Sequence, residues 1–271
     1  MSKEMLSENI SNEQIRKFSW KRAKECYRKL VVVSLIAYFP NILAILIKIP
    51  ITDTLLKTII SYILTLIFTP LSVGTTLYFY DVYMNGKSKL NKIFMFFGKK
   101  RLLITSFLLG LFYLTLQLII DSPSNILYFV KNNKTLPNYD TVILVLSILS
   151  YILIFIFFYF QIRLYLINYI FARNINKKAD IIIKESFHYT KKRVHNIIWF
   201  EITVMWWGII VAAIFSWLFR QFTDIDDLRT DIQVSLLFYY IFIAPYIHIA
   251  IAGYAHKIIE DNEFVKKKNK K

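Results

Sequence analysis

Cysteine is almost absent from this sequence. The 271 residues include a single cysteine, Cys26, so the chain cannot form an internal disulfide or a cysteine-based zinc site. Only 6 glycines occur, which gives little support to glycine-broken transport helices. The Gly-x-Ser-x-Gly, His-Glu-x-x-His and phosphate-loop motifs are also missing. We therefore expect no catalytic residues, no metal, no cofactor and no enzymatic activity.

Acidic residues are few. The chain has 18 Asp and Glu against 34 Lys and Arg, a formal net charge of +16. In a soluble protein such an excess suggests nucleic-acid binding. Here the basic residues lie in the short segments between apolar runs, where membrane topology places them. We therefore expect no nucleic-acid partner.

Long apolar runs dominate what remains, since 56% of the residues are hydrophobic. Runs of about 20 residues are long enough to cross a membrane as helices, and they are too long for barrel strands. The sequence predicts an all-α polytopic membrane protein with six transmembrane helices in a membrane domain at 30–259. The predicted spans are 30–49, 55–80, 102–120, 141–172, 196–219 and 232–254. A cytoplasmic amphipathic segment at 1–29 precedes them, and a basic tail at 260–271 follows.

Two of the predicted segments need comment. Pro123 and Pro137 are expected to keep the loop at 121–140 from forming one continuous helix, because proline removes a helical hydrogen bond. The fourth span, 141–172, is longer than a bilayer requires. It is expected either to tilt strongly or to project beyond the membrane.

The distribution of positive charge predicts the orientation. Four segments, 1–29, 81–101, 173–195 and 256–271, hold 27 of the 34 Lys and Arg residues. With six spans these segments all lie on one side of the membrane. Positive charge is retained in the cytoplasm, so both termini are expected to be cytoplasmic.

Three similar segments lead into the odd-numbered spans. They read KFSWKRAKE, FMFFGKKR and SFHYTKKR, with aromatic residues ahead of paired basic ones. One interpretation is three helical hairpins, each preceded by a cytoplasmic interfacial helix. The other is a set of generic interface anchors. In both cases we expect anionic lipid headgroups to contact Lys99, Lys100, Arg101, Lys191, Lys192 and Arg193.

A few polar side chains fall within the predicted spans, where ionisable groups are costly and suggest a functional site. Arg163, Glu201 and His248 all lie toward the cytoplasmic side, together with Gln161 and Asn168. They could line one inner-leaflet site. The competing interpretation is structural: Arg163 extends to the headgroups, Glu201 pairs with a loop lysine, and a neighbouring helix satisfies His248.

Several short motifs, in this order and spacing, support a family resemblance. They are Pro70-Leu71-x-x-Gly74, Gly86-Lys87-Ser88, Ile93-Phe94, Glu185-Ser186, the tryptophan pair region around Trp206-Trp207, and Pro245-Tyr246 with Ala252 and Tyr254. From about Lys21 to Ile259 the chain resembles the bacterial integral membrane proteins of domain-of-unknown-function family nine-seven-five. The resemblance implies a six-helix fold in a bacterial cytoplasmic membrane and no particular activity. The chain departs from the family pattern at Tyr159-Phe160-Gln161, where a Pro-Gly pair is expected.

These observations lead to two functional hypotheses. The first is a non-enzymatic envelope-associated or interaction factor whose basic cytoplasmic surface faces lipid, with membrane lipids and a membrane-protein partner or second copy as its partners. The alternative is a permease or exporter component with a polar inner-leaflet site. A lipid-modifying enzyme is less favoured, because the clustered acids and histidines of acid–base or metal chemistry are missing.

Overall fold

The computed structural model describes residues 11–48, 54–131, 139–222 and 239–268. All regular elements in these ranges are helices, and six are long and apolar enough to cross a membrane. The predicted all-α, six-span class is therefore confirmed. The candidate spans are Asn12–Ala44, Leu56–Asn85, Lys100–Leu127, Tyr139–Arg173, Val194–Val211 and Ile241–Phe264.

The first two spans form a hairpin of α1 (Asn12–Lys48) and α2 (Thr54–Asn85), which pack against each other. α1 is continuous from the predicted amphipathic segment into the first span, so this segment is not a separate interfacial helix. Ile15, Ala23 and Leu30 bury one face of α1, while Trp20 is exposed. The described part of this segment, residues 11–29, thus packs one apolar face on protein, whereas residues 1–10 lie outside the described residues.

A short helical segment precedes the third span, as the sequence predicts. It consists of the 3-10 helix η2 (Leu90–Phe94) and α3 (Met95–Gly98), both packed against α2. Its apolar residues face in two directions. Ile93 and Phe96 are fully buried, whereas Leu90, Phe94 and Phe97 are exposed.

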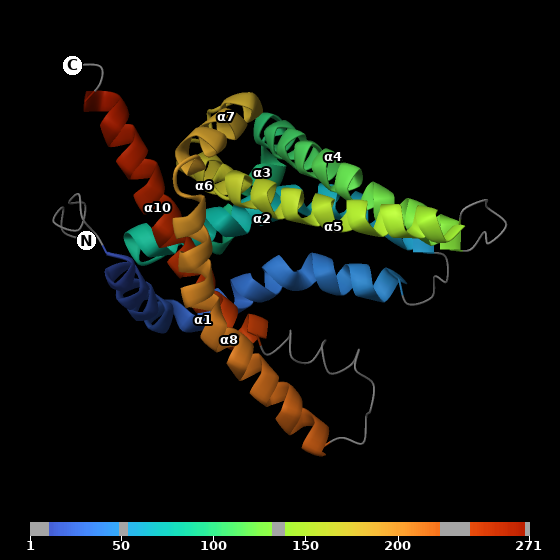
Figure 1. Cartoon of the computed structure of the whole chain (residues 1–271). Coiled ribbons are helices and arrows are strands. Elements are labelled where there is room, and N and C mark those ends of the chain that lie inside the picture. The colour runs from blue at the N-terminus through green and yellow to red at the C-terminus, as the bar shows by residue number, and fades with distance from the viewer. Residues whose placement is uncertain (1–10, 49–53, 132–138, 223–238, 269–271) are drawn as a thin grey trace.

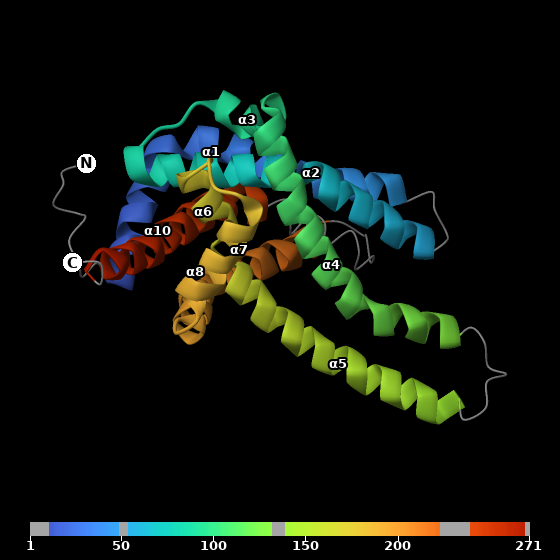
Figure 2. The ribbon, with the colours of Figure 1, turned by 90° about the horizontal axis from the view of Figure 1, so that it is seen from above.

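The second hairpin joins α4 (Lys100–Lys131) to α5 (Tyr139–Leu164). α4 continues through Pro123, so the predicted loop at 121–140 begins inside a helix; Pro137 lies outside the described residues. Pro123 cannot donate to the carbonyl of Ile119 four residues earlier. The Ser122 hydroxyl donates to that carbonyl at 2.7 Å, and α4 changes direction near this end (Figure 2).

The extra length of the fourth predicted span is explained by a break. α5 ends at Leu164, and α6 (Ile167–Arg173) follows after Tyr165 and Leu166. No proline or glycine lies at the break, so local propensity does not account for it. The long apolar segment is therefore divided into two helices, α5 and α6, and is not one long helix.

The remaining elements are α7 (Ala179–Thr190), α8 (Val194–Phe222), the π-helix η3 (Tyr239–Ile243) and α10 (Ala244–Lys268). α8 contacts both η3 and α10. The first residues of the predicted sixth span, 232–238, lie outside the described residues. α10 runs on to Lys268, so the predicted tail at 260–271 is helical at its start.

Pro245 lies at the junction of η3 and α10. It has no N–H to donate to the carbonyl of Ile241 four residues earlier. The hydroxyl of Tyr27 donates to that carbonyl at 3.1 Å. A side chain of α1 thereby provides a hydrogen bond that Pro245 cannot make within its own helix.

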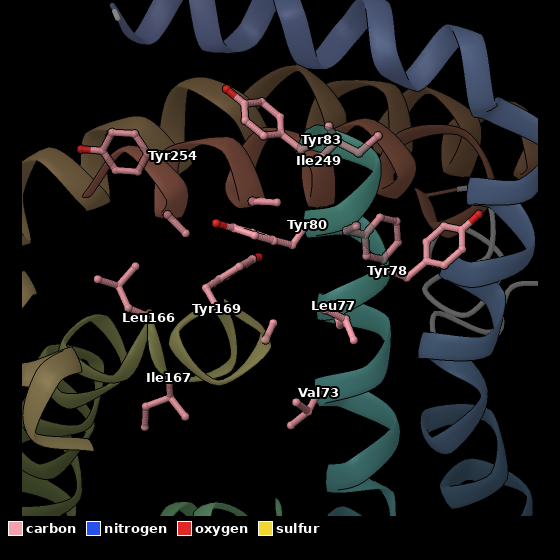
Figure 3. Close-up of a cluster of buried hydrophobic side chains, with 14 of the residues drawn as sticks. Val73, Leu77, Tyr78, Tyr80, Tyr83, Leu166, Ile167, Tyr169, Ile249 and Tyr254 are labelled. Atoms are coloured by element: carbon pink, nitrogen blue, oxygen red, sulfur yellow. The ribbon is translucent and has the colours of Figure 1, made fainter. Parts of the chain in front are cut away.

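The core lies between α2, α6 and α10. Figure 3 shows Tyr80 of α2 and Tyr169 of α6 directed into the space beneath α10. α10 is central, since 72% of the most apolar part of its span is buried, against 6% for the fourth span. Further buried residues of this core are Val73, Leu77, Tyr78, Tyr83, Leu166, Ile167, Ile249 and Tyr254.

Glycine permits close approach at two of these contacts. A Cβ atom on Gly74 would overlap the backbone carbonyl of Ile93, so α2 and η2 are in backbone contact there. A Cβ atom on Gly253 would overlap the ring of Tyr83 and approach Ile15. α1, α2 and α10 are thus tightly packed where α1 begins and α2 ends, beside the middle of α10 (Figure 1).

Candidate functional site

A cavity of about 910 Å³, which we call the intramembrane cavity, lies among the spans. Side chains from α1, α2, α4, α5, α6, α8 and α10 line it. Several of its lining residues are exposed, among them Asn41 of α1, Ser72 of α2, and Ile154 and Phe158 of α5, so the cavity is open to the outside. Pockets that bind small molecules typically have volumes of about 300–1,000 Å³.

Four of the five polar residues singled out from the sequence line this cavity. Gln161 is in α5 and Asn168 in α6, on either side of the helix break. Glu201 comes from α8 and His248 from α10. The fold therefore brings together four polar groups from separate helices within a largely apolar bundle.

The carboxylate of Glu201 is the only acid on the described wall of the cavity. It is partly buried, and none of the residues that the structure describes gives it a hydrogen bond or an ion pair. Tyr165 and Tyr169 also line the cavity. The predicted pairing of Glu201 with a loop lysine is therefore not observed.

Two of the other polar groups on the wall, His248 and Gln161, contact aromatic side chains. The ring of His248 stacks on Phe79, with the centroids 4.6 Å apart. The Gln161 amide donates a hydrogen bond to the hydroxyl of Tyr113. The Tyr165 hydroxyl is buried and has no hydrogen-bond partner among the described residues. The buried Tyr165 hydroxyl and the partly buried Glu201 carboxylate are thus among the polar groups at this cavity without a hydrogen-bond partner in the described part of the chain.

Arg163 is the exception among the predicted residues, and its place in the polar cluster is corrected. It does not line the cavity. Its guanidinium donates to the backbone carbonyl of Phe187 in α7 and to the hydroxyl of Tyr159, at 3.3 Å for the latter. The same group lies over both aromatic rings. It neither extends to the headgroups nor pairs with Glu201.

Hydrogen bonds to the backbone carbonyl of Arg163 stabilise the break between α5 and α6. At the break the carbonyl of Arg163 accepts hydrogen bonds from two hydroxyls of α7. Ser186 donates to it at 2.8 Å and Thr190 at 3.3 Å. In an uninterrupted helix, the backbone N–H four residues later would donate to this carbonyl. At the break, the two hydroxyls of α7 donate to it instead.

The predicted headgroup residues divide into two groups. Lys99, Lys100, Lys191 and Lys192 are exposed. Arg101 donates to the carbonyl of Asn176. Arg193 pairs with Asp261 of α10 at 2.7 Å. The two arginines therefore contact other segments of the protein, while Arg101 and the four lysines are all exposed at the surface.

The same end of the bundle carries a polar network that was not singled out from the sequence. Arg173 of α6 pairs with Glu263 of α10 at 2.9 Å and with Glu260 at 3.8 Å. His256 connects Glu260, at 3.3 Å, to the hydroxyl of Tyr80, at 2.7 Å. These contacts join α2, α6 and α10 beside the core.

The hydroxyl residues of α2 on the cavity wall were also missed. Thr65, Thr69, Ser72 and Thr76 recur at intervals of four, three and four residues, which places them on one helix face. This spacing could have been recognised in the sequence. The three threonine hydroxyls donate to carbonyls of their own helix.

A metal site has no support in the described part of the chain. No group of three His, Cys, Asp or Glu side chains there is arranged to hold a metal ion. Glu201 and His248 are the two residues of these types on the cavity wall.

Comparison of the chain with protein-family models, with curated proteins and with solved structures gives no match. The resemblance to family nine-seven-five stays a prediction.

The hydrogen bond at the helix break generates a prediction. Replacing Ser186 with Ala removes a buried donor to a carbonyl outside the regular helix ladder. We expect the free energy of unfolding, measured in mixed detergent micelles, to fall by about 1–3 kcal/mol.

Ser106→Ala is the matched control. Ser106 is equally buried, and its hydroxyl donates at 2.8 Å to the carbonyl of Leu102, four residues earlier in its own helix. That carbonyl keeps its backbone N–H partner, so the expected loss is below about 1 kcal/mol. Equal losses for the two variants would show that α7 does not hold the break.

Proposed function

We propose that this protein is a component of a membrane transport system, a small permease or exporter subunit, that binds a small amphiphilic molecule in the intramembrane cavity. The convergence of Gln161, Asn168, Glu201 and His248 on one cavity supports this proposal most strongly. Polar and ionisable groups inside a membrane domain are costly and usually line a ligand or ion pathway.

The opening of the cavity supports the amphiphilic character of the ligand. Ile154 and Phe158 line the cavity and are exposed on α5, a helix whose outer surface is apolar. A molecule dissolved in the bilayer could therefore enter from the side of α5. Its polar part would meet the four polar side chains.

We further propose that the protein is not an enzyme. The imidazole of His248 stacks on Phe79 and makes no hydrogen bond to a hydroxyl nucleophile among the described residues. A nucleophile and its base must lie within hydrogen-bond reach for covalent catalysis.

A role as an interaction factor with a lipid-binding surface is the second candidate. The exposed apolar residues Leu90, Phe94 and Phe97 lie next in sequence to the exposed Lys99 and Lys100. This combination suits insertion at an anionic membrane surface, with about 1 kcal/mol per nearby basic residue. The protein could have both this surface and the cavity. The surface does not account for the four polar residues on the cavity wall.

We infer that the protein lies in a bacterial cytoplasmic membrane with both termini in the cytoplasm. Contacts between the basic segments support one common side. Arg101 reaches Asn176, Arg193 pairs with Asp261, and Arg173 pairs with Glu263. The segments at 81–101, 173–195 and 256–271 therefore meet at one end, which the positive-inside rule assigns to the cytoplasm.

Cysteine labelling on intact cells tests this orientation. In a Cys26→Ser background, Asp140→Cys introduces one exposed thiol at the start of the fourth span. Lys191→Cys introduces one exposed thiol just before the fifth span, at the other end of the fourth. We expect a membrane-impermeant maleimide to label the first at once and the second only after permeabilisation. The reverse pattern would place the basic end outside.

Filling the cavity tests the proposed function. Ser72 lines the cavity and is exposed, so Ser72→Trp adds a large side chain to the wall. Native mass spectrometry of the protein extracted in detergent should show a bound amphiphile in the wild type. We expect Ser72→Trp to lose it.

Ile152→Trp is the control for this experiment, because Ile152 is 50% exposed on α5 and does not line the cavity. It should retain the bound molecule. A wild type that carries no molecule, or a Ser72→Trp variant that keeps it, would contradict binding in the cavity and favour the interaction-factor role.

A further inference from the structure

The described wall of the intramembrane cavity carries formal charge of one sign. Glu201 contributes a carboxylate, and none of the described residues that line the cavity is a lysine or an arginine. The nearest arginine along the wall-forming segment of α5, Arg163, directs its guanidinium to Phe187 of α7. An anionic ligand would therefore meet repulsion without a compensating cation.

The wall is also rich in aromatic rings. Ring faces carry negative electrostatic potential and attract ammonium-like cations, and the attraction grows when both are removed from water. Flat rings also pack against the apolar body of an amphiphile. The aromatic residues on the wall are Phe68, Phe79, Tyr113, Phe157, Phe158, Tyr165 and Tyr169.

Glu201 lacks the partner that a carboxylate in a membrane domain usually has. Burying a charge costs free energy unless a counter-charge or hydrogen bonds compensate it. Within the described residues no cationic side chain reaches it. A cationic ligand would supply the missing partner.

We propose that the intramembrane cavity selects small amphiphilic cations, with Glu201 as the counter-charge and the aromatic wall as the binding surface. This inference rests on the proposed function and adds the chemical class of the ligand. The shared recognition feature is a single positive charge on an apolar body. A free organic cation and the ammonium headgroup of a lipid both carry it.

Three probes of matched shape test this inference: tetraphenylphosphonium, tetraphenylborate and the neutral tetraphenylmethane. Their binding to the full chain is measured in a non-ionic maltoside micelle, with empty micelles as the blank. We expect saturable binding of tetraphenylphosphonium alone. Glu201→Gln should weaken its binding at least about tenfold, because it removes one unit charge near the ligand.

Two further variants control for charge and folding. Asp180→Asn removes an acid from the exposed first turn of α7, outside the cavity, and should leave binding unchanged. Ser72→Lys adds a positive charge to the wall and keeps Glu201. Ser72→Lys should weaken the binding of tetraphenylphosphonium and strengthen the binding of tetraphenylborate. If Glu201→Gln does not fold, this variant tests the inference in its place.

The outcomes separate this inference from the proposed function. Equal binding of the three probes, or an unchanged affinity in Glu201→Gln, would overturn cation selection while leaving a functional cavity. Failure of folded wild-type protein to bind any probe would also overturn it, and the Ser72→Trp experiment then judges the cavity separately. Displacement of the phosphonium by phosphatidylethanolamine would identify a lipid headgroup as the source of the cation.

Discussion

Backbone hydrogen bonding at interrupted helices is the constraint on which this structure depends. A membrane offers no water to an unpaired carbonyl, so each interruption of a spanning helix needs a donor from the protein. Three of the interruptions in the described helices have a hydroxyl donor of this kind, whereas Pro40 in α1 and Pro70 in α2 are interior prolines without one among the described residues. Tyr27 serves the carbonyl of Ile241 near Pro245, Ser122 serves that of Ile119 near Pro123, and Ser186 serves that of Arg163 at the break between α5 and α6.

The same constraint accounts for the position of the cavity. Because α5 ends before Tyr165, the chain turns, and Gln161 and Asn168 face one cavity from two different helices. Two of the three hydroxyl donors come from other helices, so the interruptions also tie α1 to η3 and α7 to α5. At the basic end, Arg173 of α6 pairs with Glu263 of α10, and Arg193, just before α8, pairs with Asp261 of α10. These ion pairs join α6 and the start of α8 to α10. Glu201 and His248 remain on the wall, where none of the described residues supplies Glu201 with a counter-charge.

Much of the fold, and part of the site, could be predicted from the sequence. The six spans follow from the length of apolar runs, and the polar residues within them mark costly positions. Pro123 was misleading, because in a membrane helix a nearby hydroxyl can replace the hydrogen bond that proline removes. The break after Leu164 could not be predicted, since it depends on Ser186, which lies 22 residues later in the sequence. Which way Arg163 points, and that Glu201 and His248 share a cavity, depend on how the helices rotate when they pack. The hydroxyl face of α2 was predictable from its spacing.

Labelling with a hydrophobic carbodiimide tests the central claim most directly, namely that Glu201 faces a cavity reachable from the bilayer. Dicyclohexylcarbodiimide partitions into membranes and modifies carboxyls there, and peptide mass spectrometry locates the adduct. We expect modification of Glu201 in preference to Asp121, whose carboxylate accepts a hydrogen bond from Tyr62 at 2.8 Å. We also expect the adduct to be lost in Ser72→Trp and kept in Ile152→Trp. An unmodified Glu201 in wild-type protein that is labelled at other carboxyls would contradict the account.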